Sequence, residues 1–121
     1  MQVELLSAKV TGQILTVTIR YVPGENASFA STNYPIKEVS YIEDATAKQY
    51  SVLQDESGLY LASPKSNTSS QRRGEMINLG VSSSGGPKIA WFKFPAPPSE
   101  AQTISINIPE VAPFDGVAIQ Q

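Results

Sequence analysis

The chain has 121 residues, a net charge of −2 and neither cysteine nor histidine. The missing residue types exclude disulfides, thiolate nucleophiles and histidine general bases, so any chemistry would depend on carboxylates, Lys, Tyr or Ser. The length and the 40% apolar composition suit one soluble domain over residues 1–121, and the charge offers no general attraction for nucleic acid.

Alternation of apolar and polar residues, which is typical of half-buried strands, begins near the amino terminus. Residues 2–10 form a first predicted strand, and residues 14–21 form a longer one in which Leu15 and Val17 share a face. The stretch 23–35 lacks this pattern, so we predict an irregular connection there that crosses between sheets.

Shorter strands follow, separated by polar turns. Residues 55–58 predict a hairpin loop, the polar stretch 63–73 predicts a surface loop, and residues 82–87 predict a turn. The later strands are expected at 36–43, 48–54, 58–63, 74–81, 87–94, 103–108 and 116–119.

No segment carries a helical stripe of apolar residues, and no apolar run approaches the length of a membrane span. Strands at intervals of about 8–12 residues with polar turns between them are typical of a sandwich. The sequence therefore predicts an all-β protein, an immunoglobulin-like antiparallel β-sandwich of about seven to nine strands.

Three motifs follow one another in the second half of the chain. They are Asp44-x-x-x-Lys48-x-Tyr50, then the Phe-Pro-Ala-Pro-Pro run at 94–98, then Pro-Phe-Asp-Gly-Val at 113–117. This succession, over residues 36–119, resembles a group of uncharacterised bacterial exported domains, relatives of the immunoglobulin-like domains of lipoproteins. The resemblance implies an export context and an accessory or binding role, and it supplies no catalytic residues.

The sequence departs from this group at one position. Members often carry cysteine just before the serine that corresponds to Ser63, and this chain has Ala62 there. Whatever a thiol contributes in those relatives is therefore not expected here.

Two pairs of acidic residues, Glu43-Asp44 and Asp55-Glu56, are the candidates for carboxylate chemistry or for calcium. Neither pair has the spacing of a calcium loop. A strand between them, at ~3.3 Å per residue, would separate them by more than about 20 Å. We therefore expect solvated turn acids, with no catalytic residues, no metal and no cofactor, and we predict that the protein is not an enzyme. A carboxylate-based hydrolase remains a lesser alternative.

Basic residues gather between positions 63 and 94, where five Lys or Arg stand against the single acid Glu75. Together with an aromatic side chain they offer a patch for a polyanion, a glycan or a peptide. In a strand, Trp91 and Phe92 point to opposite faces, and the sequence leaves open which of them lies outside. The candidate ligand-binding residues are Trp91, Lys93, Arg72 and Arg73.

The first functional expectation is a non-catalytic interaction or accessory module of a bacterial envelope protein. Its partner would be another protein or another domain of the same polypeptide, with no nucleic acid and no membrane span. The second expectation is a sandwich that binds a carbohydrate or small ligand through Trp91 and the loop 63–73. Residues 1–4 lack the features of a signal peptide, so an extracytoplasmic location (periplasmic, lipid-anchored or secreted) requires that an export signal was removed; otherwise the protein is cytoplasmic.

Overall fold

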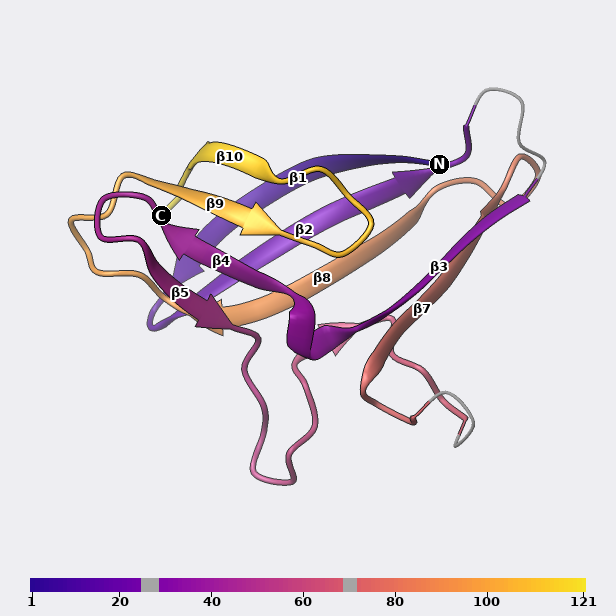
Figure 1. The fold of residues 1–121 in the computed structure, drawn as a ribbon, viewed down its shortest axis with the longest axis horizontal. Coiled ribbons are helices and arrows are strands. Elements are labelled where there is room, and N and C mark those ends of the chain that lie inside the picture. Colours follow the sequence, from indigo (N-terminus) through magenta and orange to yellow (C-terminus); the bar gives the residue numbers. More distant parts are fainter. Residues whose placement is uncertain (25–28, 69–71) are drawn as a thin grey trace.

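The computed structural model describes residues 1–24, 29–68 and 72–121. In these ranges the chain forms ten strands, and every ladder between strands is antiparallel (Figure 1). The all-β sandwich is confirmed, whereas the expected seven to nine strands were too few. The strands are β1 (Gln2–Thr11), β2 (Ile14–Val22), β3 (Phe29–Pro35), β4 (Ser40–Glu43), β5 (Lys48–Ser51), β6 (Ala62–Ser63), β7 (Met76–Ser82), β8 (Lys88–Pro95), β9 (Thr103–Asn107) and β10 (Phe114–Ala118).

One layer of the sandwich is a sheet with the strand order β1-β2-β8-β6. The predicted strand 14–21 is confirmed as β2, which pairs with β1 on one side and β8 on the other. Each of its inward positions carries a large apolar side chain, so period-two patterning alone was enough to predict it. The sheet buries Leu15, Val17, Ile19 and Tyr21 from β2 and Ala90, Phe92 and Phe94 from β8.

The facing layer is a second sheet with the order β10-β9-β4-β5, which lies across the first in Figure 1. It contributes Tyr41, Ile104 and Ile106 to the same core, each with no exposed surface. The Tyr41 ring stacks on Tyr50 and meets Phe94 edge-on, and its hydroxyl donates to the Pro95 carbonyl at 2.6 Å. This contact joins the two layers.

A two-stranded ribbon, β3 paired with β7, extends the second layer at one end of the molecule (Figure 1). Residues 29–35 of the predicted irregular connection are thus a strand, and residues 25–28 lie outside the described residues. Burial alternates along this strand, but its inward-facing residues are small or polar. Ala30 is partly buried, and Thr32 and Tyr34 are buried, so the sequence of this strand lacks the apolar alternation that predicts a strand.

The predicted strand 36–43 was wrong in its first half. Residues Ile36–Glu38 form one turn of 3-10 helix, closed by the Val39 N–H donating to the Ile36 carbonyl, and only Ser40–Glu43 is strand. The turn lets both Ile36 and Val39 enter the core, whereas a strand would place residues three apart on opposite faces. It also redirects the chain from the ribbon into the second sheet.

The predicted hairpin over 48–63 is confirmed only at its tip. Backbone bonds join Asp55 to Leu59 and Leu61 to Leu53, but β5 then pairs with β4 and β6 pairs with β8. The two arms therefore enter different sheets. The expected strand 58–63 shortens to two regular residues, and the expected 48–54 shortens to four. Among the described residues no helix is long or apolar enough to cross a membrane.

Candidate functional site

The turn between β4 and β5 positions the first acidic pair. Glu43 is in phase with Tyr41, so its side chain points inward and is only 3% exposed. Its carboxylate accepts bonds from the Ala45 N–H and the Thr46 hydroxyl. The prediction of a solvated turn acid was therefore wrong for Glu43, because strand phase placed it in the core and the turn supplies its donors.

Asp44, the residue after β4, is exposed, and its side chain reaches the neighbouring strand β9. The Thr103 and Ser105 hydroxyls donate to its two carboxylate oxygens, each at 2.7 Å. These bonds favour the ionised form and hold the pKa of Asp44 below its ordinary value of 3.8. Asp44 therefore acts as a clamp between the β4–β5 turn and β9.

Replacing this clamp should give a pH-dependent loss of stability. The lowered pKa means that the stabilisation is fully present above pH 3.8 and disappears as pH falls through the folded-state pKa. We expect Asp44→Asn to melt below the wild type near neutral pH, with the two melting temperatures converging in acid. Asp115→Asn, at an exposed position of β10, is the matched control. A difference that stays constant across this pH range would contradict the assignment.

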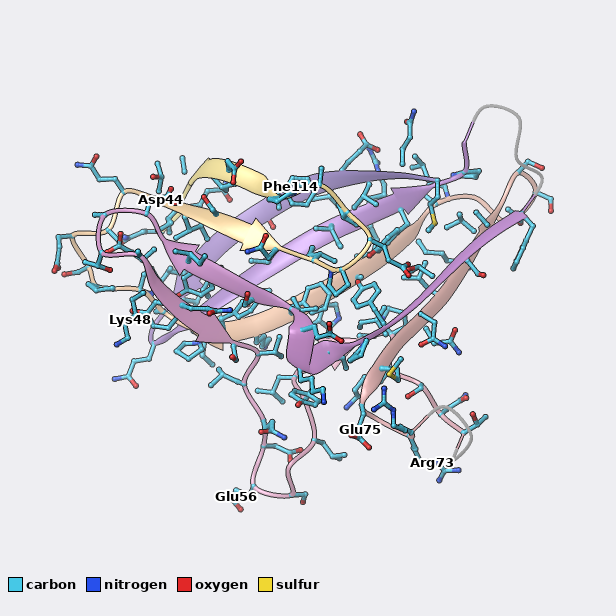
Figure 2. The ribbon with its side chains drawn as sticks, in the orientation of Figure 1. Asp44, Lys48, Glu56, Arg73, Glu75 and Phe114 are labelled. Atoms are coloured by element: carbon cyan, nitrogen blue, oxygen red, sulfur yellow. The ribbon has the colours of Figure 1, made fainter. Side chains whose placement is uncertain are left out.

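The second acidic pair forms an ordinary turn. The Asp55 carboxylate accepts from the N–H groups of Ser57 and Leu59 at 2.8 and 3.0 Å, and both Asp55 and Glu56 are exposed. Figure 2 shows Asp44 and Glu56 at different ends of the molecule. Within 1–24, 29–68 and 72–121, no group of three or more acidic side chains is arranged to hold a metal ion.

The strand β8 settles the question left open for Trp91. Ala90, Phe92 and Phe94 are buried, so Trp91 and Lys93 lie on the outer face of the first sheet. The Lys93 Nζ lies 5.7 Å from the centre of the Trp91 ring, within the range of a cation–π contact. Trp91 is half-buried rather than fully exposed.

Three strands build the surface around this residue, which we call the Trp91 face. Across the ladders, Trp91 lies beside Thr18, Lys93 beside Thr16, and Ile89 beside Arg20. On β1, the bulge between Leu5 and Ser7 leaves the side chain of Leu6 exposed, and Arg20 forms a 3.0 Å ion pair with Glu4. The Trp91 face comprises Glu4, Leu6, Ser7, Lys9, Thr16, Thr18, Arg20, Ile89, Trp91 and Lys93.

The other two predicted ligand-binding residues lie elsewhere. Arg73 lines a hollow of about 520 Å³ with Leu59, Lys65 and three smaller residues, none of them from the Trp91 face. Figure 2 places Arg73 beside the start of β7. Arg72 donates to the Met76 sulfur at 3.0 Å. Residues 69–71 of the predicted surface loop lie outside the described residues. The predicted set is thus divided between two surfaces.

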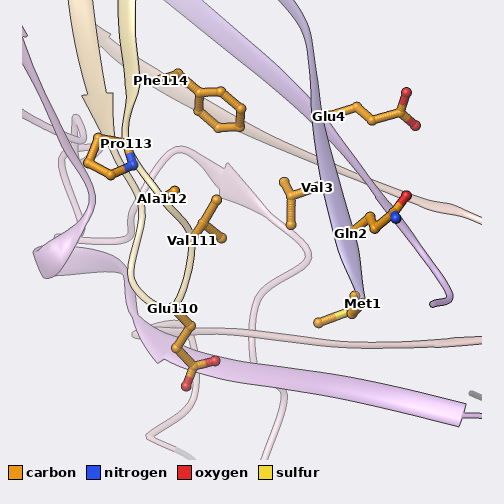
Figure 3. A pocket seen from close by; sticks show the side chains of 9 residues that line it. All are labelled: Met1, Gln2, Val3, Glu4, Glu110, Val111, Ala112, Pro113 and Phe114. Carbon is orange, nitrogen blue, oxygen red and sulfur yellow. The ribbon is translucent and has the colours of Figure 1, made fainter.

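A further hollow, of about 550 Å³, opens between the start of β1 and residues 110–114 (Figure 3). Its carboxylates, Glu4 and Glu110, lie on opposite sides and point away from each other. Glu4 is paired with Arg20, and Glu110 accepts a bond from the Thr32 hydroxyl at 2.7 Å. The arrangement offers no convergent acid and base for the hydrolase alternative.

A buried tyrosine pair escaped sequence-based prediction. The hydroxyls of Tyr21 and Tyr34 lie 2.7 Å apart and join the first sheet to the ribbon. Burial raises the pKa of both hydroxyls, so both remain neutral and serve each other as donor and acceptor. The sequence carries no local signal of this pair, because the two tyrosines meet only when the first sheet packs against the ribbon.

Comparison with known proteins adds no assignment. No family model, no curated protein and no solved structure matches this chain, so the resemblance to exported lipoprotein domains remains a prediction.

Proposed function

We propose that this chain is a non-catalytic interaction module that docks another protein, or another domain of its own polypeptide, on the Trp91 face. The observation that carries the proposal is the composition of this face. Leu6 on β1 and Ile89 on β8 are 43% and 48% exposed. Arg20 lies beside Ile89 on the strand between them, and Trp91 follows two residues after Ile89 on the same face of β8. Aromatic residues and arginine are the types enriched where proteins bind one another.

The backbone of this face supports the same proposal. β2 is paired on both sides, with β1 and with β8, so the backbone in the middle of this face is held in the sheet and its side chains are what a partner would contact. The threonines at 16 and 18 are short, which leaves the larger side chains of β1 and β8 standing on either side. A surface whose backbone is already fixed loses little conformational entropy when a partner binds.

The proposed setting is extracytoplasmic, in a bacterial envelope protein with lipoprotein-like context. Its support is the resemblance of residues 36–119 to exported domains. The setting is proposed separately from the docking face, which is equally suited to a cytoplasmic partner.

Cross-linking in cells that make the protein natively tests the docking face. A photo-reactive amino acid at Thr18, in the middle of the face, is expected to give a discrete adduct with one protein. Ile89→Ser combined with Trp91→Ala should remove the adduct. Leu59→Ser, at a side chain that is 46% exposed on another surface, should leave it unchanged. Equal loss in both variants, or no discrete adduct, would contradict the proposal.

A carbohydrate is the second candidate ligand, and the Trp91–Lys93 contact favours it. An aromatic ring with a cation above it suits an anionic sugar, since the ammonium group would meet the acid while the ring contacts the pyranose. The chain has a single tryptophan, so its fluorescence reports on this face alone. Saturable quenching by an acidic oligosaccharide, lost in Lys93→Ala, would favour the sugar over the protein partner.

A further inference from the structure

One hydrogen bond shows which of the opposed residue pairs in the β3–β7 ribbon are joined by backbone hydrogen bonds. The Ile36 N–H donates to the Glu75 carbonyl at 2.9 Å, one step beyond the Pro35–Met76 pair. In antiparallel ladders, bonded and non-bonded pairs alternate. The bonded pairs of the ribbon therefore involve Ala30, Thr32 and Tyr34 of β3.

Two bonds on the far side of β7 agree with this phase. The Asn78 N–H donates to the Pro64 carbonyl, and the Met76 carbonyl accepts from the Ser66 N–H at 2.8 Å. The backbone N–H and C=O groups of Met76 and Asn78 therefore point away from β3. The outer edge of β7 is covered by the segment 64–66.

The outer edge of β3 is not covered in this way. By the same alternation, the N–H and C=O groups of Phe29, Ser31 and Asn33 point away from β7. The sheet holds two strands, and no described residue supplies a backbone partner to these groups.

β3 has few of the features that normally protect an edge strand from pairing with another chain. The strand carries no charged side chain and no bulge, and its one proline stands at its last position. The ring of Phe29 leans over Gly80 on β7, where an added Cβ would lie 3.1 Å from it. The ring therefore does not stand in the path of an approaching strand.

We infer that β3 is the pairing edge for a second copy of this chain. Two β3 strands related by a two-fold axis through Ser31 would form a continuous antiparallel sheet in the order β7-β3-β3-β7. Ser31 then faces Ser31 of the second copy, and Phe29 faces Asn33. All three outward-pointing residues are used, for about six new backbone hydrogen bonds.

The chemistry of the edge favours a second copy as the occupant. A two-fold interface brings the same strand of both copies together, so a strand whose charges had one sign would repel itself. β3 is neutral throughout and places a small hydroxyl at the axis. The dimer leaves the Trp91 face on the other layer, so it would present two such faces and gain avidity for a repeated partner. This inference stands independently of the docking proposal.

Sedimentation velocity over about 10 μM to 1 mM tests the inference, since small interfaces of this kind are weak. The wild type is expected to move from 13.0 kDa toward twice that mass as its concentration rises. Ser31→Lys and Ser31→Glu, both at an exposed side chain, should each weaken self-association at least about tenfold, because like charges would meet at the axis. Circular dichroism checks that both variants remain folded.

A mixture of the two variants gives the sharpest result. Equal amounts of Ser31→Lys and Ser31→Glu should restore the dimer at low ionic strength, and added salt should weaken it. Ser51→Lys, on the exposed edge strand β5 of the other sheet, is the matched control and should dimerise like the wild type. A wild type that stays monomeric throughout, a dimer broken by Ser51→Lys, or a mixture that fails to associate would each overturn the inference.

Discussion

Phe92→Ala is expected to lower the free energy of unfolding by about 3–5 kcal/mol, the cost of an emptied aromatic site in a close-packed core. The Phe92 side chain has no exposed surface, and its strand neighbours are Val17 on β2 and Ala62 on β6. Ala62 is too small to fill the space that the ring would leave. Equilibrium denaturation in urea, followed by far-ultraviolet circular dichroism, measures the change.

Trp91→Ala is the matched control, one residue away on the opposite face of β8. Because Trp91 is half-buried and packs only against the outer face, we expect its loss to cost less than about 1.5 kcal/mol. Phe92→Leu, with an expected cost near 1–2 kcal/mol, keeps the comparison measurable if the alanine variant does not fold. A larger loss for Trp91→Ala than for Phe92→Ala would reverse the assigned faces of the strand.

Glu43→Ala carries the second large expected effect, a loss of about 2–3 kcal/mol. The carboxylate is buried and accepts from the Ala45 N–H and the Thr46 hydroxyl, so its removal leaves donors of the turn without their partner. The same turn holds Ala47 at a φ of 60°, a conformation that alanine adopts only at a cost. The turn therefore depends on the bonds that Glu43 makes. Thermal unfolding near neutral pH measures the loss.

Glu56→Ala is the comparison for this second effect. Glu56 is an exposed acid in a turn of similar length, and we expect a change within about 0.5 kcal/mol. Similar small losses for both substitutions would mean that Glu43 is a solvated turn acid, as its sequence context suggests.

The strands that could be predicted from sequence are those whose inward positions are all apolar. β2 and β9 alternate apolar residues with mostly polar ones, β8 has apolar residues at its inward positions, and the structure places all three strands where they were expected. β3 alternates equally well in burial but uses Ala, Thr and Tyr, so hydrophobicity did not reveal it. The sequence allowed either Trp91 or Phe92 to point outward. Alternation specifies that neighbouring side chains lie on opposite faces of a strand, but not which of the two faces the core.

The sequence by itself determined the fold class, the inward faces of β2 and β9, and the absence of histidine and cysteine chemistry, because these follow from local periodicity and composition. Only the tertiary structure decided that β5 and β6 enter different sheets, that Glu43 is buried, and that Arg72 and Arg73 lie away from Trp91. It also decided that the outer edge of β3 has no backbone partner among the described residues. These outcomes depend on which strands meet across the core, and residues distant in the chain carry no local signal of that encounter.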